Sequence, residues 1–382
     1  MDAILQVEQL VPLWLRFAAG FVVLIGGAEF LVRGASRLAA GFGIKPLVIG
    51  LTVVSFGTSA PELAVSVGSS LTGNSDVAVG NIVGSNVMNI LLVLGLAALV
   101  APLVVRDQLV RLDVPLLIVV SFLVWIMAAD GIVSHVEGFI LFGGLIAYLL
   151  VVFQTVRKGG KAAAVPTDDD VVDAKPVWWR DVGLVFAGLV GLTIGARWLV
   201  DGAVAAAEAM NVSQLVIGLT IVAIGTSLPE IATSVLASIR GERDLAVGNV
   251  VGSNLFNLLC VLGLTAALPP EGVPVSTAAI NFDLPVMCAV AVLCFPIFFT
   301  KGRISRGEGL LMLGYFAAYM AYLLLDATGH EAVTPLSWVM LAFVVPLTVI
   351  GLTGAAVLSF RERLQRRERL MELREARAGS AS

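Results

Sequence analysis

The sequence predicts an all-α membrane protein made of two inverted five-helix repeats, followed by an eleventh transmembrane helix. Two observations favour this fold class. Hydrophobic residues make up 58% of the chain and charged residues only 14%, whereas a soluble globular domain carries about 25% charged residues. Residues 47–96 also align without a gap on residues 215–264, at a constant offset of 168, and about two thirds of the aligned positions are identical. The chain therefore consists of two related, membrane-embedded halves.

Apolar segments of about 20 residues are long enough to cross a bilayer, and they follow one another along both halves. In the first half they cover 11–32, 46–70, 77–104, 112–130 and 134–156, and in the second half 181–206, 213–239, 245–269, 279–300 and 308–326. One more segment, 335–360, has no counterpart in the first half. We therefore divide the chain into a first repeat (1–156), a polar linker (157–178), a second repeat (179–330), an extra transmembrane helix (331–360) and a basic tail (361–382).

Lysine and arginine lie almost entirely on one side of this arrangement, and cytoplasmic loops are the ones that retain positive charge. That side holds the linker, the loops around Arg106, Arg240 and Lys301, and the arginine-rich tail. The opposite loops contain no Lys or Arg; they are 71–76, 130–135, 207–212, 270–278 and 327–334. We therefore expect a multi-pass protein of a bacterial inner membrane, with its N-terminus outside and its linker and C-terminus in the cytoplasm.

Equivalent points of the two repeats are separated by five spans, and because five is odd the second repeat must be inverted relative to the first. Inverted repeats with interrupted helices are how many secondary transporters build a substrate site near the middle of the membrane. The count alone thus indicates a transporter architecture.

One hexapeptide occurs in both repeats, as Gly57-Thr58-Ser59-Ala60-Pro61-Glu62 and Gly225-Thr226-Ser227-Leu228-Pro229-Glu230. A carboxylate near the bilayer centre costs about 2.5–3.5 kcal/mol on insertion scales, so such groups mark ion or substrate paths. A basic neighbour could neutralise a lone glutamate instead, but no Lys or Arg lies within one helical turn of Glu62 or Glu230. Each proline also interrupts the helix and frees a backbone carbonyl. The hexapeptides therefore predict a cation site.

Oxygen donors surround both hexapeptides. Thr58 and Thr226 precede the glutamates by four residues and so share their helix face. The next helix of each repeat carries a polar stripe, Asn81, Ser85 and Asn89 in one and Asn249, Ser253 and Asn257 in the other. For Asn81 and Asn249, interhelical packing beside the small residues Gly80, Gly84, Gly248 and Gly252 competes equally with ion contact. For Ser85, Asn89, Ser253 and Asn257 ion contact is favoured. The two carboxylates, the two threonine hydroxyls and several backbone carbonyls already approach the six to eight oxygens that calcium accepts.

Other polar residues have plainer interpretations. Glu29 with Arg33, and Arg197 with Asp201, are spaced to form ion pairs on one helix face. His135 and His330 fall in outside loops, where we expect them to be solvated. The three cysteines, Cys260, Cys288 and Cys294, lie in apolar runs and predict no redox or metal site.

The motifs resemble the sodium/calcium exchangers of the cation/calcium antiporter superfamily, whose two repeats carry G-T-S-x-P-E and G-S-N-x-x-N or G-S-N-x-x-D. Here the second motif is Gly84–Asn89 and Gly252–Asn257. The resemblance implies an antiporter that exchanges sodium for calcium by alternating access, with no catalytic group, no cofactor and no nucleic-acid partner. It implies ion contacts from the side chains of Thr58, Glu62, Ser85, Asn89, Thr226, Glu230, Ser253 and Asn257 and the carbonyls of Ser55 and Ala223. The eleventh span and the basic tail depart from the usual ten-span pattern.

Three other functions can be weighed against this one. An intramembrane hydrolase would need a nucleophile with a base or paired aspartates, and neither a G-x-G-D nor a G-x-S-G arrangement with an intramembrane histidine occurs. A passive cation channel is compatible with the repeats. A calcium/proton antiporter is compatible with the carboxylates, although such relatives usually lack the Thr-Ser before Pro-Glu. Sodium-driven exchange is therefore the favoured hypothesis, with oligomeric state and stoichiometry left open.

Overall fold

The computed structural model describes residues 12–158, 177–299, 302–330, 332–346, 349–351 and 354. The first repeat consists of α2 (Leu13–Phe42), α3 (Pro46–Ile49), η1 (Gly50–Val54), α4 (Ser55–Thr58), α5 (Ala60–Leu71), α6 (Ser75–Met88), η2 (Asn89–Leu94), α7 (Gly95–Val100), β1 (Leu103–Val104), η3 (Leu109–Asp113), α8 (Val114–Met127), η4 (Ala128–Asp130), β2 (Ile132–Val133) and α9 (His135–Lys158).

The second repeat has the same order of elements, except that η4 has no counterpart among its described residues. It consists of α10 (Trp178–Ala209), α11 (Gln214–Ile217), η5 (Gly218–Val222), α12 (Ala223–Thr226), α13 (Leu228–Ile239), α14 (Arg243–Phe256), η6 (Asn257–Leu262), α15 (Gly263–Ala267), β3 (Val273–Pro274), η7 (Ala279–Asp283), α16 (Leu284–Phe299), β4 (Arg303–Ile304) and α17 (Arg306–Ala327). After it come α18 (Val333–Val339) and η8 (Met340–Val344).

The predicted ten-span core is confirmed. Within the described residues, eight helices are long and apolar enough to cross a membrane, and two bent helix pairs raise the number to ten. The pairs are Pro46–Thr58 with Ala60–Leu71, bent by 43°, and Thr220–Thr226 with Leu228–Ile239, bent by 57°. Of the predicted eleventh span, the structure describes α18, η8 and helical residues at 345–346, 349–351 and 354. The basic tail and most of the linker lie outside the described residues, so these parts of the domain division stay predictions.

The first helix is longer than its apolar stretch. α2 continues beyond the predicted span end at residue 32 as far as Phe42, where Gly43 ends it in the left-handed conformation at φ 63°. Apolarity locates the bilayer, whereas the helix ends only where Gly43 supplies a C-terminal cap. Polar residues such as Arg33 and Arg37 therefore lie on a continuous helix rather than in a loop.

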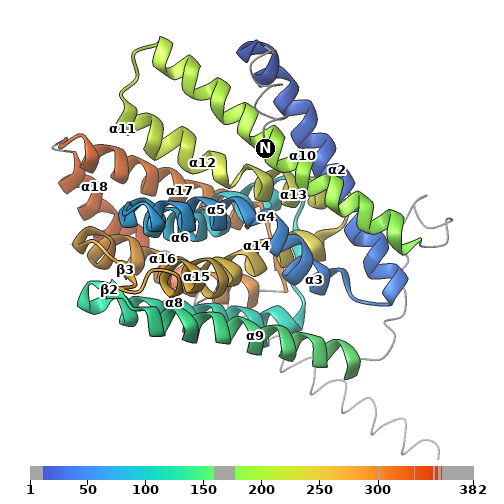
Figure 1. Cartoon of the computed structure of the whole chain (residues 1–382). Helices are drawn as coiled ribbons and strands as arrows, with labels where there is room; N and C mark the ends of the chain where they lie inside the picture. Colours follow the sequence, from blue (N-terminus) through green and yellow to red (C-terminus); the bar gives the residue numbers. More distant parts are fainter. Residues whose placement is uncertain are drawn as a thin grey trace, which may run out of the picture.

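α2 and α10 run side by side as two long helices at one edge of the bundle (Figure 1). Glycines line their contact. A Cβ atom at Gly27 would lie 2.6 Å from the backbone nitrogen of Leu192, and one at Gly188 would lie 2.5 Å from that of Leu31. Only glycine permits this approach, which gives the van der Waals packing that associates helices in lipid. The first helices of the two repeats thus form one closely packed pair.

Two short antiparallel β-ribbons join the repeats. β1 pairs with β4, with Leu103 opposite Ile304, and β2 pairs with β3, with Val133 opposite Val273. Each ribbon combines the loop after the third span of one repeat with the loop before the fifth span of the other. Because the repeats are inverted, the two ribbons lie at opposite membrane faces, and each satisfies backbone groups that the helices leave free.

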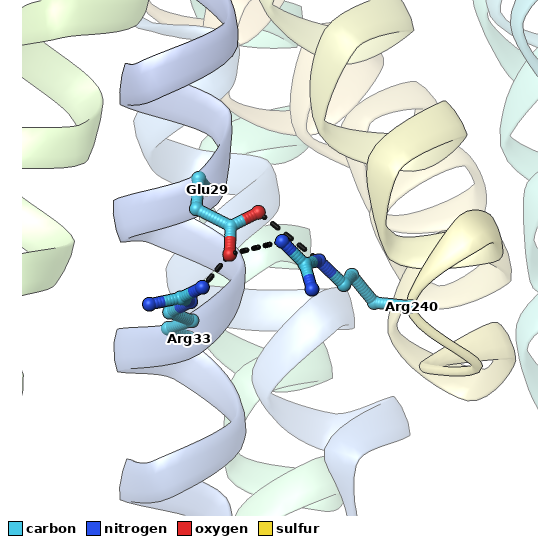
Figure 2. A network of polar contacts seen from close by, with 3 residues as sticks. All are labelled: Glu29, Arg33 and Arg240. Atoms are coloured by element: carbon cyan, nitrogen blue, oxygen red, sulfur yellow. Dashed lines mark hydrogen bonds and ion pairs between the residues drawn. The ribbon is translucent and has the colours of Figure 1, made fainter. Parts of the chain in front are cut away.

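The ion pairs extend what the sequence predicted. Glu29 accepts from Arg33, as expected from their spacing, and also from Arg240 at the end of α13 (Figure 2). Arg197 lies 4.0 Å from Asp201, as predicted. Asp244, in the first turn of α14, accepts a hydrogen bond from Arg106 Nε at 2.8 Å.

That hydrogen bond raises the pKa of the Arg106 guanidinium above its ordinary value, with the negative charge of Asp244 as a second cause. The pair connects the loop before η3 to the start of α14.

The prediction for His135 was wrong. Instead of lying solvated in a loop, His135 begins α9, is only partly exposed and stacks edge-on against Phe139 at 4.8 Å between ring centroids. Ser134 caps the start of this helix, because its backbone nitrogen donates to Glu137 at 2.8 Å. The histidine ring takes no part in this cap and packs against Phe139 instead. His330 is exposed, as predicted.

Candidate cation site

Glu62 and Glu230 lie directly after the breaks in the two bent pairs. The breaks fall at Ser59 and Ser227, and each proline is at the start of the following helix. Each glutamate therefore occupies the first turn of α5 or α13, where the positive end of the helix dipole favours a negative charge. Both side chains are only 1% exposed.

The two carboxyl groups face a shared polar interior. They lie close enough to repel each other electrostatically, and the hydroxyls of Thr58, Ser59 and Ser253 lie next to the Glu230 carboxyl. Even so, none of the four carboxylate oxygens has a hydrogen bond of ordinary geometry to any described residue. Burying a charge without a partner is costly, so these oxygens are suited to a ligand that brings positive charge.

Thr58 lies at the junction between the repeats. Its Oγ1 is 3.2 Å from Asn249 Oδ1 and 3.4 Å from Ser253 Oγ, both on α14 of the other repeat. It also approaches the carbonyl oxygen of Ser55 at 3.4 Å. Three predicted ion contacts, Thr58, Ser253 and the Ser55 carbonyl, are thus brought together with Glu230.

The equivalent cluster around Thr226 is less closely assembled. Thr226 Oγ1 donates to the carbonyl of Ala223 at 3.2 Å within its own turn, and Thr226 is partly exposed whereas Thr58 is buried. The glycine contacts show the same difference. A Cβ at Gly248 would lie 2.7 Å from the carbonyl oxygen of Leu47, whereas one at Gly80 would have no described atom within 4 Å. Among the described residues, the first broken helix is therefore closely packed on α14, and the second contacts α6 less closely.

The profile of the family described as "Sodium/calcium exchanger protein" matches residues 12–154 and 181–325, which are the two repeats. The chain belongs to this family. It is therefore an exchanger, that is, a multi-pass membrane transporter with the inverted-repeat fold that the sequence predicted.

Individual relatives are similar over most of their length. The protein CaxA of Alkalimonas amylolytica is 41% identical over 317 residues, covering 81% of this chain and 97% of CaxA. The inner membrane protein YrbG of Escherichia coli (strain K12) is 38% identical over 311 residues, covering 80% of this chain and 94% of YrbG. A solved structure of the sodium-calcium exchanger NCX_Mj is 30% identical, covers 80% of this chain and 96% of that one, and superposes with a TM-score of 0.68.

Four of the predicted side chains lie on the polar stripes. Ser85 and Asn89 on one stripe and Ser253 and Asn257 on the other are all buried. Neither amide group of Asn89 or Asn257 has a hydrogen-bond partner among the described residues. Both asparagines also begin π-helical turns, η2 and η6. Such turns occur frequently at functional sites because they loosen the hydrogen-bond ladder.

The sequence interpretation missed several polar residues of this region. Ser66 and Ser234 accept hydrogen bonds from Asn81 and Asn249, and the hydroxyls of Ser59 and Ser227 at the breaks have no described partner. All four recur at the 168-residue offset. That duplication was the available signal, although serine in an apolar helix is by itself too common to stand out. The π-helical turns have no comparable sequence signal.

Proposed function

We propose that this exchanger moves sodium against calcium by alternating access, with the ions bound between the two bent helix pairs. Glu62 and Glu230 supply the charge. The remaining ligands are Thr58, Thr226, Ser85, Asn89, Ser253 and Asn257, with the backbone carbonyls of Ser55 and Ala223. The observation that carries the proposal is the pair of buried carboxyl groups of Glu62 and Glu230, whose four oxygens have no hydrogen bond of ordinary geometry to any described residue.

The charge of this site suits one calcium ion. No third carboxylate, histidine or cysteine of the described chain joins the two glutamates as a metal-binding group, so the site carries two negative charges when both are ionised. One calcium or two sodium ions balance them. The surrounding hydroxyl, amide and carbonyl oxygens are the hard ligands that both ions prefer.

The difference between the two broken helices supports alternating access. With the N-terminus outside, the chain enters α11 and α6 from the outer face, so the loosely packed contact near Gly80 lies in the outer half of the membrane. The closely packed contact of Gly248 with Leu47 then lies in the inner half. We infer that this structure is an outward-facing state. In the inward-facing state the contact near Gly80 becomes closely packed and the contact of Gly248 with Leu47 loosens, so that the two repeats exchange their arrangements.

The Lys/Arg distribution supports the orientation used here, with the linker and tail in the cytoplasm. The relative YrbG is named as an inner membrane protein, which supports the same location for this chain.

Transport into proteoliposomes tests the function. We expect calcium-45 to accumulate when an outward sodium gradient is imposed and to stay at equilibrium levels when sodium is equal on both sides. Accumulation driven by an outward proton gradient without sodium would identify a calcium/proton antiporter. Calcium flux that follows its own gradient and is independent of both ions would identify a channel.

A further inference from the structure

One asparagine–serine pair links the polar stripe to the helix that bears the glutamate, and it occurs in both repeats. Asn249 Nδ2 donates to Ser234 Oγ at 3.0 Å, and Asn81 Nδ2 donates to Ser66 Oγ at 2.9 Å. These pairs correspond at the 168-residue offset. Each therefore performs the same task in its own repeat.

The direction of the amide group follows from a third contact. Asn81 Nδ2 also lies 3.3 Å from the backbone carbonyl oxygen of Glu62, and a carbonyl oxygen can only accept a hydrogen bond. The nitrogen of Asn81 must therefore face α5, which directs its oxygen away from that helix. The amide group of Asn249 is oriented in the same way, because its Nδ2 faces Ser234 and its Oδ1 lies 3.2 Å from Thr58 Oγ1.

This direction matters for the threonine. A hydroxyl has one hydrogen and two lone pairs, and it can bind a cation only through a lone pair. The hydrogen of Thr58 must therefore point away from the ion. Asn249 Oδ1 is an acceptor in the right place to receive it. If the amide were reversed, its nitrogen would donate to Thr58 and occupy one of its two lone pairs, and the hydroxyl hydrogen would lose this acceptor.

We propose that Asn249 and Asn81 are positioning residues for the transported cation: each fixes the hydroxyl hydrogen of the threonine on the opposite repeat, Asn249 for Thr58 and Asn81 for Thr226. This inference rests on the proposed function, because it assumes that the two threonines bind the ion. It assigns the asparagines to neither of the two roles that the sequence left open, since they bind no ion themselves and do more than pack helices together.

The two halves of the structure show the arrangement at different stages. Thr58 is nearer to Asn249 Oδ1, at 3.2 Å, than to its own-turn carbonyl of Ser55, at 3.4 Å. Thr226 instead donates to its own-turn carbonyl of Ala223 at 3.2 Å. Closer packing of α12 against α6 brings Thr226 to Asn81, so that its hydroxyl donates to the amide oxygen instead of to the Ala223 carbonyl. The carbonyl lone pair is then released for the ion. Ion binding and closure of the outer half are thereby coupled.

A double-mutant cycle tests this assignment. The variants are Thr58→Val, Asn249→Ala and both together, and the readouts are the half-saturating calcium concentration and the maximal rate of sodium-driven calcium uptake. Asn249→Ala should raise the half-saturating concentration about fivefold, as expected for loss of one hydrogen bond, with the maximal rate changed less. In the Thr58→Val background, Asn249→Ala should raise the half-saturating concentration less than about twofold. The matched control is the double variant of Thr58→Val and Asn81→Ala. The fold-changes that these two substitutions cause in the half-saturating concentration should multiply.

Equal effects of Asn249→Ala in both backgrounds, or an unchanged half-saturating concentration, would refute the positioning role. If Asn249→Ala does not insert into the membrane, Ser234→Ala takes its place in the same cycle, with a smaller rise that also disappears in the Thr58→Val background. Retention of calcium uptake by Glu62→Gln would instead refute the proposed function, and the two failures are therefore distinguishable.

Discussion

Glu29 and Arg240, 211 residues apart in the chain, form a two-point ion pair, with Arg240 Nη2 2.7 Å from Glu29 Oε1 and Nε 3.2 Å from Oε2. Arg33 contacts the same carboxylate from the next turn of α2 (Figure 2). The pair joins α2, which packs along α10, to the end of α13, the helix that carries Glu230. One carboxylate thus serves two guanidinium groups at a contact between the α2–α10 pair and the rest of the bundle.

We expect Glu29→Gln to lower the thermal midpoint in detergent more than Arg240→Gln does. Removing Arg240 leaves Glu29 paired with Arg33, whereas removing Glu29 leaves two cations side by side without their shared anion. Half of the Arg240 side chain is exposed, so its own loss should cost no more than about 1 kcal/mol. Arg111→Gln, which removes an exposed pair with Asp107, should leave the midpoint unchanged. A larger effect from Arg240→Gln would contradict this account.

Glu62→Gln and Glu230→Gln should each abolish sodium-driven calcium uptake while the protein still folds and inserts. A divalent cation that leaves water needs negative charge in a poorly polarisable site, and an amide supplies only a dipole. Calcium-45 uptake, with size-exclusion chromatography to verify folding, measures both halves of the expectation. Near-native uptake by either variant would place the ion site elsewhere.

Thr58→Val and Thr226→Val should weaken transport less than the glutamate variants do. Each removes a single neutral oxygen at nearly constant volume, and the site keeps its charge. The expected result is a raised half-saturating calcium concentration with uptake still measurable. Complete loss of uptake in a folded Thr226→Val protein would show that the threonine does more than supply one ligand.

Much of this architecture could be predicted because duplication and apolarity are encoded position by position. The 168-residue offset revealed the repeats, and Pro61 and Pro229 revealed the bends, since a missing amide hydrogen is visible in the sequence itself. Thr58, Ser253 and Glu230 were each predicted as ion contacts because they belong to motifs that occur in both repeats.

Other features depend on three-dimensional packing and left no local pattern. The contact of Arg240 with Glu29 joins two helices that are far apart in the chain, and no spacing rule predicts that they are neighbours. Gly80 and Gly248 both lie in the sequence Ala-Val-Gly-Asn but differ in how closely they are packed, so the residues alone could not predict this difference. The π-helical turns that begin at Asn89 and Asn257 have no recognisable sequence signal, so asparagine alone could not predict them.

The orientation of the chain can be checked with two single cysteines in a background that lacks Cys260, Cys288 and Cys294. Ser75, at the start of α6, should be labelled by an impermeant reagent from outside, and Thr167, in the linker, only from the cytoplasmic side. The expectation follows from the absence of Lys and Arg in the loop 71–76 and their abundance in the linker. Labelling of both from the same side would contradict the orientation and the inversion of the repeats together.

The last prediction is that sodium-driven calcium uptake does not require potassium, and it rests on Asn89 and Asn257. In the superfamily that the motifs resemble, this position can be an aspartate, and the potassium-dependent branch carries a carboxylate there. Here both residues are buried amides, so the charge of the site comes from Glu62 and Glu230 alone. One calcium balances it, and a potassium ion would bring positive charge with nothing left to neutralise.

Replacing potassium by choline on both sides of the membrane should therefore leave uptake unchanged, and loss of uptake would overturn the charge argument. Asn257→Asp is the informative variant, because it adds a third carboxylate at constant size to a site that holds two. Its exchange should become dependent on pH or on an added monovalent cation, since either a proton or that cation must offset the extra charge when calcium is bound. Asn254→Asp is the matched control: it adds the same charge on the same buried helix, three residues before Asn257, at a position not proposed to contact the ion. If both variants acquire the same dependence, the effect is one of net charge in the region, whereas a response confined to Asn257→Asp assigns that side chain to the ion.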